Sequence, residues 1–189
     1  MCLIYDYLFS NGKRREVIIS GMRLRSILHY LLHRSPAPQV NTTPHPGIEL
    51  ERYMGRWYEQ ARFENWFESG MDFVHTDYTL GGNGSVTVVN TGKNSKGTIS
   101  SSRGKAILRA PGKLAVSFVP PYGWFRVPYH ILYVDTDYRT ALVSGQSGDY
   151  LWLLSREPEP ARELLQPLLE EAQQRGFNTA QLRYTKQNC

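Results

Sequence analysis

Cysteine is scarce in this sequence of 189 residues: there are two, Cys2 and Cys189, one near each end. Chain ends are often not anchored to the fold, so these two thiols are poorly placed to meet. The sequence therefore argues against a structural disulfide and against a metal site built from cysteine. The sequence also lacks long apolar runs. None approaches the roughly 18 apolar residues that a membrane-spanning helix needs.

A large excess of charge of one sign is absent too. The chain has 22 Lys and Arg against 17 Asp and Glu, a formal net charge of +5. The basic residues are spread along the sequence and are not clustered with interleaved aromatic residues, so we expect no nucleic-acid partner. With 41% hydrophobic and 12% aromatic residues, the chain suits one domain with a sizeable core.

The first part of the chain differs from the rest. Residues 1–46 show no sustained periodicity and end in stretches rich in Pro, Thr and Asn, a composition typical of linkers. We predict a poorly structured N-terminal extension over residues 1–46 and a folded domain over 47–189. Within the extension, residues 22–32 resemble a degenerate secretory signal, with basic residues before an apolar run that His29 interrupts. Met22 is an alternative start of the protein.

Beyond Gly47, short apolar runs alternate with turns that contain Gly, Pro or Asn. This pattern predicts strands over residues 53–64, 73–80, 85–91, 98–109, 113–119, 126–135, 141–144, 150–155 and 177–184. One helix is predicted near the C-terminus, where apolar residues recur at helical spacing between Ala161 and Ala172 and Gly176 marks the end. Many short strands with intervening turns favour an all-β fold, an antiparallel barrel or sandwich.

Alternation along the strands predicts an enclosed interior. If Trp57 points inward, Glu59, Ala61 and Phe63 point inward with it. A barrel of about eight strands is either filled by side chains or holds one small ligand. At one end of it we expect Arg156 to lie over the indole of Trp57 through a cation–π contact, and the other end to stay open. Glu59 would then be a buried carboxylate that needs a partner or must stay protonated, and we expect a structural hydrogen bond near the closed end.

Three motifs, in order along the chain, resemble the signatures of the lipocalin family. Gly55-Arg56-Trp57 resembles the first, Thr136-Asp137-Tyr138 resembles the turn that forms the second, and Arg156 resembles the arginine that packs across the tryptophan. The resemblance covers about residues 48–184. It implies an eight-stranded antiparallel up-and-down β-barrel with one C-terminal α-helix packed outside. Gly55, Trp57, Thr136, Asp137, Tyr138 and Arg156 are predicted to be structural.

Residues 58–64 and 149–158 are similar to the bacterial lipocalin group, relatives of apolipoprotein D. The resemblance implies a cell-envelope protein, periplasmic or in the outer membrane, that binds a fatty acid or lysophospholipid and helps to maintain the membrane under stress. The lipoprotein form of this group needs a lipid-bearing cysteine after its signal, and none lies between Cys2 and Cys189. We therefore expect either an unanchored variant or a misassigned start, which leaves a cytoplasmic or secreted location open.

A set of inward-facing side chains is predicted to bind the ligand. Trp152 matches a pocket-lining position of bacterial lipocalins, and Tyr129 can offer a hydroxyl to a polar headgroup if it faces inward. The remaining predicted lining residues are Phe63, Val74, Leu114, Val116 and Phe118, each of which could instead pack under the helix. The apolar segment 119–125 is predicted to be a loop at the mouth that either contacts a membrane or packs on itself.

Other classes of function have weaker support. His75 and His130 stand alone on separate strands, so we expect no metal site and no cofactor. No cysteine can be placed in the lumen and no serine has evident His and carboxylate partners, so we expect no enzyme. The sequence thus predicts binding, storage or transport of a small hydrophobic ligand. A scavenger of a flat hydrophobe such as a pigment is the alternative, and a homodimer is left open.

Overall fold

The computed structural model describes residues 18–19, 22–23, 40–65, 68–82, 84–118 and 127–188. The chain divides into two compact units, residues 1–36 and 37–189. In the first unit the described residues are an antiparallel pair of short strands, β1 (Ile18–Ile19) and β2 (Met22–Arg23). All other described elements belong to the second unit.

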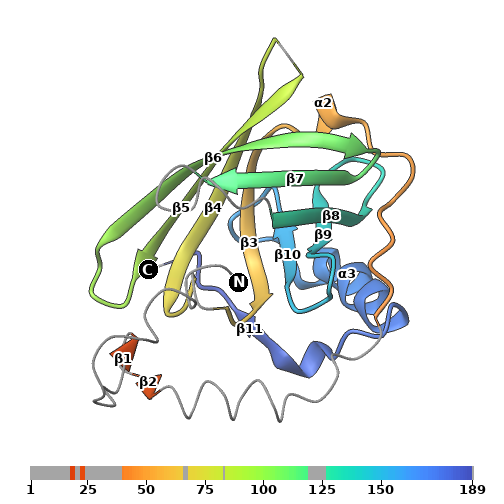
Figure 1. The fold of residues 1–189 in the computed structure, drawn as a ribbon. Coiled ribbons are helices and arrows are strands. Elements are labelled where there is room, and N and C mark those ends of the chain that lie inside the picture. The colour runs from red at the N-terminus through yellow and green to blue at the C-terminus, as the bar shows by residue number, and fades with distance from the viewer. Residues whose placement is uncertain are drawn as a thin grey trace, which may run out of the picture. The chain divides into compact units, whose positions relative to one another are not determined.

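The second unit is built around one antiparallel sheet (Figure 1). Its strands are β3 (Gly55–Phe63), β4 (Met71–Leu80), β5 (Ser85–Asn94), β6 (Ile99–Ala110), β7 (Lys113–Phe118), β8 (Val127–Val134), β9 (Thr140–Ser144), β10 (Leu151–Ser155) and β11 (Leu182–Tyr184). From β3 to β10 each strand pairs with the next, and β10 pairs back with β3, which closes a barrel of eight strands. β11 extends the sheet beside β3. The predicted up-and-down barrel is therefore confirmed.

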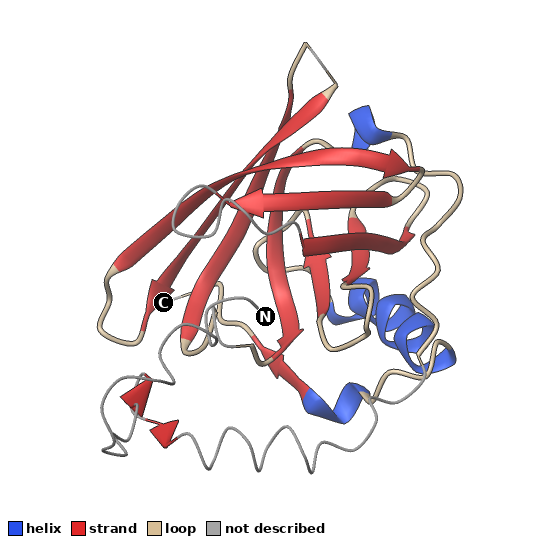
Figure 2. Cartoon of the chain, in the orientation of Figure 1, coloured by secondary structure: helices blue, strands red, loops and turns tan. Residues whose placement is uncertain are grey.

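One long helix, α3 (Arg162–Gln174), packs on the outside of the barrel (Figure 2). Its buried Leu168 and Ala172 join a cluster with Ala61, Leu132, Leu142, Leu151, Leu153 and Phe177. Gly176, with φ of +88°, ends the helix, and the backbone of Phe177 donates to the carbonyl of Ala172 at 3.0 Å. The predicted C-terminal helix is confirmed. No helix in the described part of the chain is long and apolar enough to span a membrane.

The ends of two predicted strands have other structures. Residues 50–53 form a short helix, α2 (Leu50–Tyr53), and β3 begins only at Gly55. Before β11, residues 179–181 form a 3₁₀ turn, η1 (Thr179–Gln181), where the side chain of Asn178 accepts from the backbone of Ala180. In both places the chain forms hydrogen bonds within a short local turn, where the hydrophobic pattern alone predicted a strand.

Trp57 and Arg156 close one end of the barrel. Trp57 is fully buried, and its indole N–H donates to the carbonyl of Tyr53 at 2.8 Å. The guanidinium carbon of Arg156 lies 3.9 Å from the centroid of the Trp57 ring. Arg156 also donates to the carbonyls of Tyr138, Arg56 and Arg52 at 2.8 to 3.2 Å. One cation thus ties together β3, α2 and the turn between β8 and β9.

Gly55 has a geometric reason to be glycine. Its φ is +93°, a conformation that side chains disfavour, and an added Cβ would lie 3.3 Å from a guanidinium nitrogen of Arg156.

The turn that contains Thr136 and Asp137 is fixed by Tyr138, whose φ is +57° and whose hydroxyl accepts from the backbone of Glu49 at 2.8 Å. The carbonyl of Thr136 accepts from Arg52, and Asp137 is exposed.

Residues 40–46 lie along the barrel, although the sequence assigns them to the N-terminal extension. The backbone of His45 donates to the carbonyl of Ile131 at 2.8 Å, and that of Asn41 donates to the carbonyl of Arg175 at 2.9 Å. The Arg175 guanidinium in turn donates to the carbonyls of Asn41 and Thr43. A proline-containing segment cannot form a full ladder, but its remaining polar groups find partners on β8 and the end of α3.

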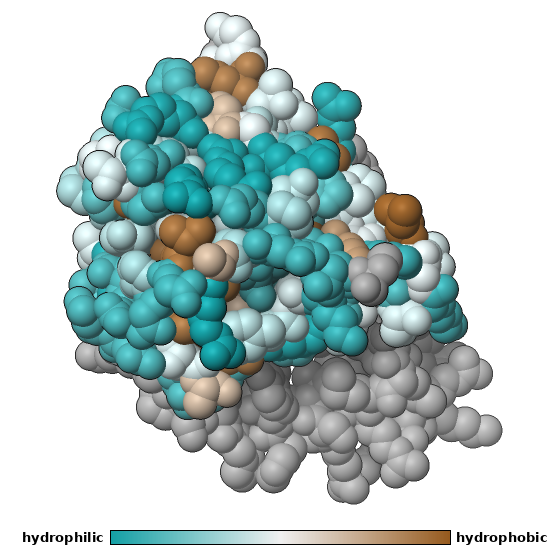
Figure 3. All heavy atoms as spheres, turned by 180° about the vertical axis from the view of Figure 1, so that it is seen from behind, coloured by the Kyte–Doolittle hydropathy of each residue, from teal (hydrophilic) through white to brown (hydrophobic). Residues whose placement is uncertain are grey.

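The hydropathy of the outer surface agrees with a barrel whose apolar side chains are buried. The face opposite to the view of Figure 1 is mostly hydrophilic, with separate small apolar patches (Figure 3). Apolar side chains are buried in two clusters, one in the lumen around Trp57 and one under α3. The two clusters lie on opposite faces of the same strands, as alternation requires.

We predict that Trp57→Ala destabilises the barrel by about 3 to 5 kcal/mol, because it empties a buried site and removes the surface on which Arg156 stacks. Urea denaturation measures the change. Arg139→Ala is the control, since its ion pair with Glu157 at 2.7 Å is half-exposed and should contribute less than about 1 kcal/mol. Equal losses in the two variants would contradict the role given to Trp57.

Candidate functional site

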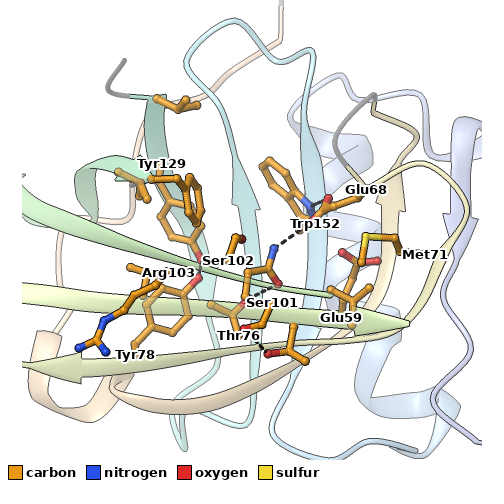
Figure 4. Close-up of a pocket in the computed structure, with 18 of the residues that line it drawn as sticks. Glu59, Glu68, Met71, Thr76, Tyr78, Ser101, Ser102, Arg103, Tyr129 and Trp152 are labelled. Atoms are coloured by element: carbon orange, nitrogen blue, oxygen red, sulfur yellow. Dashed lines mark hydrogen bonds between the residues drawn. The ribbon is translucent and has the colours of Figure 1, made fainter. Parts of the chain in front are cut away.

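The barrel encloses a cavity of about 900 Å³. This volume lies within the range of sites for single small ligands, roughly 300 to 1,000 Å³. Its apolar wall is formed by Met71, Val74, Val88, Val116, Phe118, Val127, Pro128 and Leu154, with the aromatic side chains of Tyr78, Tyr129, Tyr150 and Trp152. Figure 4 shows Tyr78 and Tyr129 on one side of the cavity and Trp152, Glu68 and Glu59 on the other.

The cavity extends to the end of the barrel opposite Trp57, which we call the mouth. Among the described residues, the mouth is formed by the connections between β3 and β4, β5 and β6, and β9 and β10, at residues 64–65, 68–70, 95–98 and 145–150. Glu68 and Tyr150 from these connections line the cavity, and Ser100 and Ser102 on its wall are exposed. A ligand can therefore enter from the mouth, while Trp57 and Arg156 block the other end.

Five of the seven predicted lining residues border the cavity: Val74, Val116, Phe118, Tyr129 and Trp152. Leu114 does not border it. Its side chain is buried in the lumen cluster with Trp57, one layer below the cavity. The predicted mouth loop, residues 119–125, lies outside the described residues, and its contact with a membrane stays a prediction.

Phe63 faces the opposite way from its prediction. Its ring packs outside the barrel, 6.1 Å from the ring of Phe177. The cause is a bulge in β3: Leu153 pairs with Ala61 and Leu154 with Glu59, so that Gln60 is an extra residue. A single extra residue reverses the alternation after it. Ala61 and Phe63 therefore face α3, although the straight strand predicted them inside.

The same bulge turns Arg62 into the interior, where it is fully buried. It donates to the Oε1 atom of Glu59 at 2.5 Å and to the carbonyl of Glu68 at 2.6 Å. The hydroxyl of Thr185 also donates to Glu59. The sequence did not identify Arg62, because on a regular strand residues 59 and 62 face opposite sides. The one feature of the sequence that could have indicated Arg62 was the predicted burial of Glu59, because a buried carboxylate needs a positively charged partner.

Glu68 is a second buried carboxylate on this side of the cavity. Its oxygens accept from the side-chain amides of Asn65 at 2.7 Å and Asn90 at 3.1 Å. The indole N–H of Trp152 donates to it at 3.0 Å. These bonds hold the connection between β3 and β4 against the barrel wall and fix the ring of Trp152. Sequence reasoning missed Glu68, since two of its three partners, Asn90 and Trp152, come from distant strands.

Trp152 also forms a flat aromatic surface with Tyr150. The two rings are stacked with centroids 5.7 Å apart and an interplanar angle of 6°. Both line the cavity near the mouth. The surface combines an apolar face with the nearby negative charge of Glu68.

Three tyrosine hydroxyls form a chain at the inner end of the cavity. Tyr78 donates to the hydroxyl of Tyr129 at 2.8 Å, and the hydroxyls of Tyr53 and Tyr129 are also 2.8 Å apart. Burial raises the pKa of all three phenols above their ordinary value of 10. The hydroxyl of Tyr129, which the sequence offers to a headgroup, thus already binds two neighbours and stays neutral at physiological pH.

The pKa of Glu59 is raised to about 7 from its ordinary value of 4.5, first by burial and then by the nearby carboxylate of Glu68. Arg62 and Thr185 act in the opposite direction but do not offset these effects. Arg62 pairs with the carboxylate of Glu59 but bonds only to the backbone carbonyl of Glu68, so a proton on Glu59 relieves the repulsion between the two nearby carboxylates.

Across the described ranges, no three His, Cys, Asp or Glu side chains are placed to hold a metal ion. His130 lies outside the lumen, with Nδ1 2.9 Å from the carbonyl of Thr42. Neither His130 nor His75 borders the cavity.

The shift of Glu59 predicts how stability depends on pH. Folded protein retains the proton to about pH 7 and unfolded protein releases it near 4.5, so the free energy of unfolding should fall as pH rises through this range. Relative to Glu59→Gln, the wild type should lose roughly 2 to 3 kcal/mol between pH 5 and 8, measured by urea denaturation. The exposed Glu157→Gln is the control and should leave the pH profile unchanged. Parallel profiles for wild type and Glu59→Gln would exclude the proposed protonation.

Comparison with known proteins identifies the family. The family model described as "Lipocalin-like domain" matches residues 48–187. The outer membrane lipoprotein Blc of Citrobacter freundii is 37% identical over 154 residues, which cover 81% of this chain and 87% of the relative. Temperature-induced lipocalin-1 of Arabidopsis thaliana is 40% identical over 152 residues, 75% of this chain and 81% of the relative.

Solved structures share the fold. Apocrustacyanin C2 superposes with a TM-score of 0.66 at 19% identity and covers 81% of this chain and 90% of its own. The family and the apolar cavity together support the binding of a small hydrophobic ligand. The sequence match over residues 48–187, the closed eight-stranded barrel and the Trp57–Arg156 contact lead to one conclusion: the chain belongs to the lipocalin family.

Proposed function

We propose that the protein binds a fatty acid or a lysophospholipid and stores or transports it. The acyl tail lies in the barrel cavity and the headgroup lies at the mouth. The observation that carries this proposal is the cavity of about 900 Å³, apolar over most of its wall and closed at the end where Trp57 and Arg156 meet. Removal of the tail from water supplies the affinity, at about 0.8 kcal/mol per methylene group.

The polar groups of the cavity favour this orientation. At the inner end the tyrosine hydroxyls are bonded to one another, and Arg62 is bonded to Glu59. An anionic headgroup placed there would lose its hydration without gaining a free cation. The mouth leaves the headgroup in contact with water.

Of the two ligand classes, fatty acids and lysophospholipids, the surroundings of Trp152 favour a lysophospholipid whose headgroup carries a positive charge. The carboxylate of Glu68 lies 3.0 Å from the indole nitrogen, beside the stacked ring of Tyr150. An ammonium group gains from both a carboxylate and an aromatic face, whereas the carboxylate of a fatty acid would be repelled by Glu68.

Binding without catalysis fits the cavity better than an enzyme does. A nucleophilic serine needs a base within hydrogen-bond reach. Among the described residues that line the cavity, no serine hydrogen-bonds to Glu59, Glu68 or a histidine.

We place the protein in the cell envelope, as the name of its outer membrane lipoprotein relatives suggests, with a role in maintaining the membrane. A carrier of free fatty acids or lysophospholipids is useful where membrane lipids are turned over. Fractionation of the native host tests the location: recovery of the protein in the cytoplasm alone would contradict it.

A scavenger of flat hydrophobes is the second candidate. The stacked Tyr150–Trp152 pair favours it, because a planar ligand could continue the stack. The two candidates differ in how affinity depends on ligand shape. A lipid carrier gains affinity with each added methylene until the cavity is full, whereas a pigment carrier prefers fused rings and ignores tail length.

We predict that Trp152→Ala weakens binding of a lysophosphatidylcholine at least about tenfold, because it removes a large apolar contact surface. Titration calorimetry measures the affinity. The thermal midpoint should fall less than in Trp57→Ala, since Trp152 is only partly buried. Trp152→Phe is the matched control: it keeps an aromatic face but loses the bond to Glu68, so it should bind with intermediate affinity.

We further predict that the affinity of lysophosphatidylcholines rises with tail length, by up to roughly fourfold per methylene, until the cavity is filled. Titrations with a series of saturated tails measure this dependence. An affinity that does not change with tail length, together with tight binding of a planar aromatic probe, would favour the scavenger and contradict the lipid carrier.

A further inference from the structure

The charges of the barrel unit are sharply segregated. Between Asp77 and Asp135 the sequence contains no acidic residue and seven basic ones: Lys93, Lys96, Arg103, Lys105, Arg109, Lys113 and Arg126. The rest of residues 40–188 contains nine basic and fifteen acidic residues. Six of the seven basic residues lie on β5, β6 and β7 or in the turn between β5 and β6, and the remainder of the unit is acidic.

The fold gathers these basic residues, which are dispersed along the sequence, on one surface. On β6, Arg103 and Lys105 alternate with the buried Gly104 and Ala106, so they lie on the outward side of the strand, and Arg103 also borders the cavity (Figure 4). β5 and β7 flank β6 (Figure 1), with register pairs that join Lys105 to Thr87 on one side and to Ser117 on the other. We call the outward side of β5, β6 and β7, with the turn between β5 and β6, the basic face. Its charged residues are Lys93, Lys96, Arg103, Lys105, Arg109 and Lys113.

The positive charges of this face lack acidic partners. None of its six side chains forms an ion pair with another described residue, and Lys93 alone has a cation–π contact, 5.0 Å from the ring centroid of Phe73. Several arginines elsewhere form ion pairs: Arg56 bonds to Asp77 at 2.8 Å and Arg175 to Glu171 at 2.7 Å. Five of the six side chains are exposed. The face thus offers a strong, accessible positive potential to an anionic partner.

One apolar residue marks the end of the face at the mouth. Ile99 is 70% exposed, pairs with Lys93 across the β5–β6 hairpin and lies three residues from Lys96. Ser100 and Ser102, which line the cavity, directly follow it. An exposed isoleucine between lysines suits the interface of an anionic bilayer, where the side chain enters the headgroup region and the lysines bind lipid phosphates.

A nucleic acid fits this face less well. Single strands are held by aromatic rings on which bases stack, and no aromatic residue points outward from β5, β6 or β7. A phosphate backbone would also gain nothing from Ile99. The position of Ile99 beside the mouth, by contrast, would place the cavity against the source of a lipid ligand.

We propose that the part of the basic face nearer the mouth, with Lys93, Lys96, Arg103 and Lys105, docks the protein on bilayers that contain anionic lipids, with the β5–β6 hairpin in the headgroup region and the mouth of the barrel at the membrane surface. The proposed contact involves the outer surface of the barrel. A test of membrane docking therefore does not depend on which ligand the cavity binds.

Co-sedimentation of the full chain with vesicles tests the proposal. Vesicles of phosphatidylcholine are compared with vesicles that also contain phosphatidylglycerol, at low and high salt. We expect binding to the anionic vesicles only, and a loss at high salt. Lys96→Glu/Lys105→Glu should lower the partition coefficient at least about tenfold. Neither residue borders the cavity.

Arg162→Glu/Lys186→Glu is the matched control. It makes the same change in net charge at exposed positions outside the basic face, and it should lower binding far less. Ile99→Ser should weaken binding severalfold without removing its salt dependence. Equal losses in the two double variants, equal binding to both kinds of vesicle, or tighter binding to a short DNA duplex than to anionic vesicles would each overturn the proposal.

Discussion

The contact between Arg156 and Trp57 is the constraint on which the rest of the barrel depends. A closed sheet of eight strands needs one end filled, and a buried indole under a guanidinium fills it while satisfying three backbone carbonyls. Because this end is occupied, the lumen becomes a pocket with one entrance. The positive φ of Gly55 and the turn at Tyr138 follow from the same contact, since both let backbone carbonyls reach Arg156.

Much of this architecture could be predicted from the sequence. Short alternating strands predicted the barrel, helical spacing predicted α3, and the position of Trp57 and Arg156 in the motifs predicted their contact. The errors arose where one residue changes a regular pattern. The extra residue Gln60 reversed the faces of Phe63 and Arg62, and local alternation contains no sign of a bulge whose cause lies in pairing with β10.

The polar residues of the cavity were harder to predict for a different reason. Glu59 bonds to Arg62 and Thr185, and Glu68 bonds to side chains on β5 and β10. Thr185, Asn90 and Trp152 are far in the sequence from the carboxylates they bind, and Arg62 is near Glu59 but is turned toward it only by the bulge, so no spacing rule links these groups. Their effect is to make one wall of an apolar cavity acidic, while the outer side of β5, β6 and β7 is basic. The inside of the barrel and its outer surface thus differ in the sign of their charge.

The central claim is that the barrel carries a lipid with an acyl tail. Native mass spectrometry of the full-length protein, purified without detergent from its own host, tests it most directly, with bound molecules extracted and identified. The account predicts one bound fatty acid or lysophospholipid per barrel, with lysophospholipids enriched. A barrel that is recovered empty and takes up no added lysophospholipid, or one that carries a planar pigment, would contradict it.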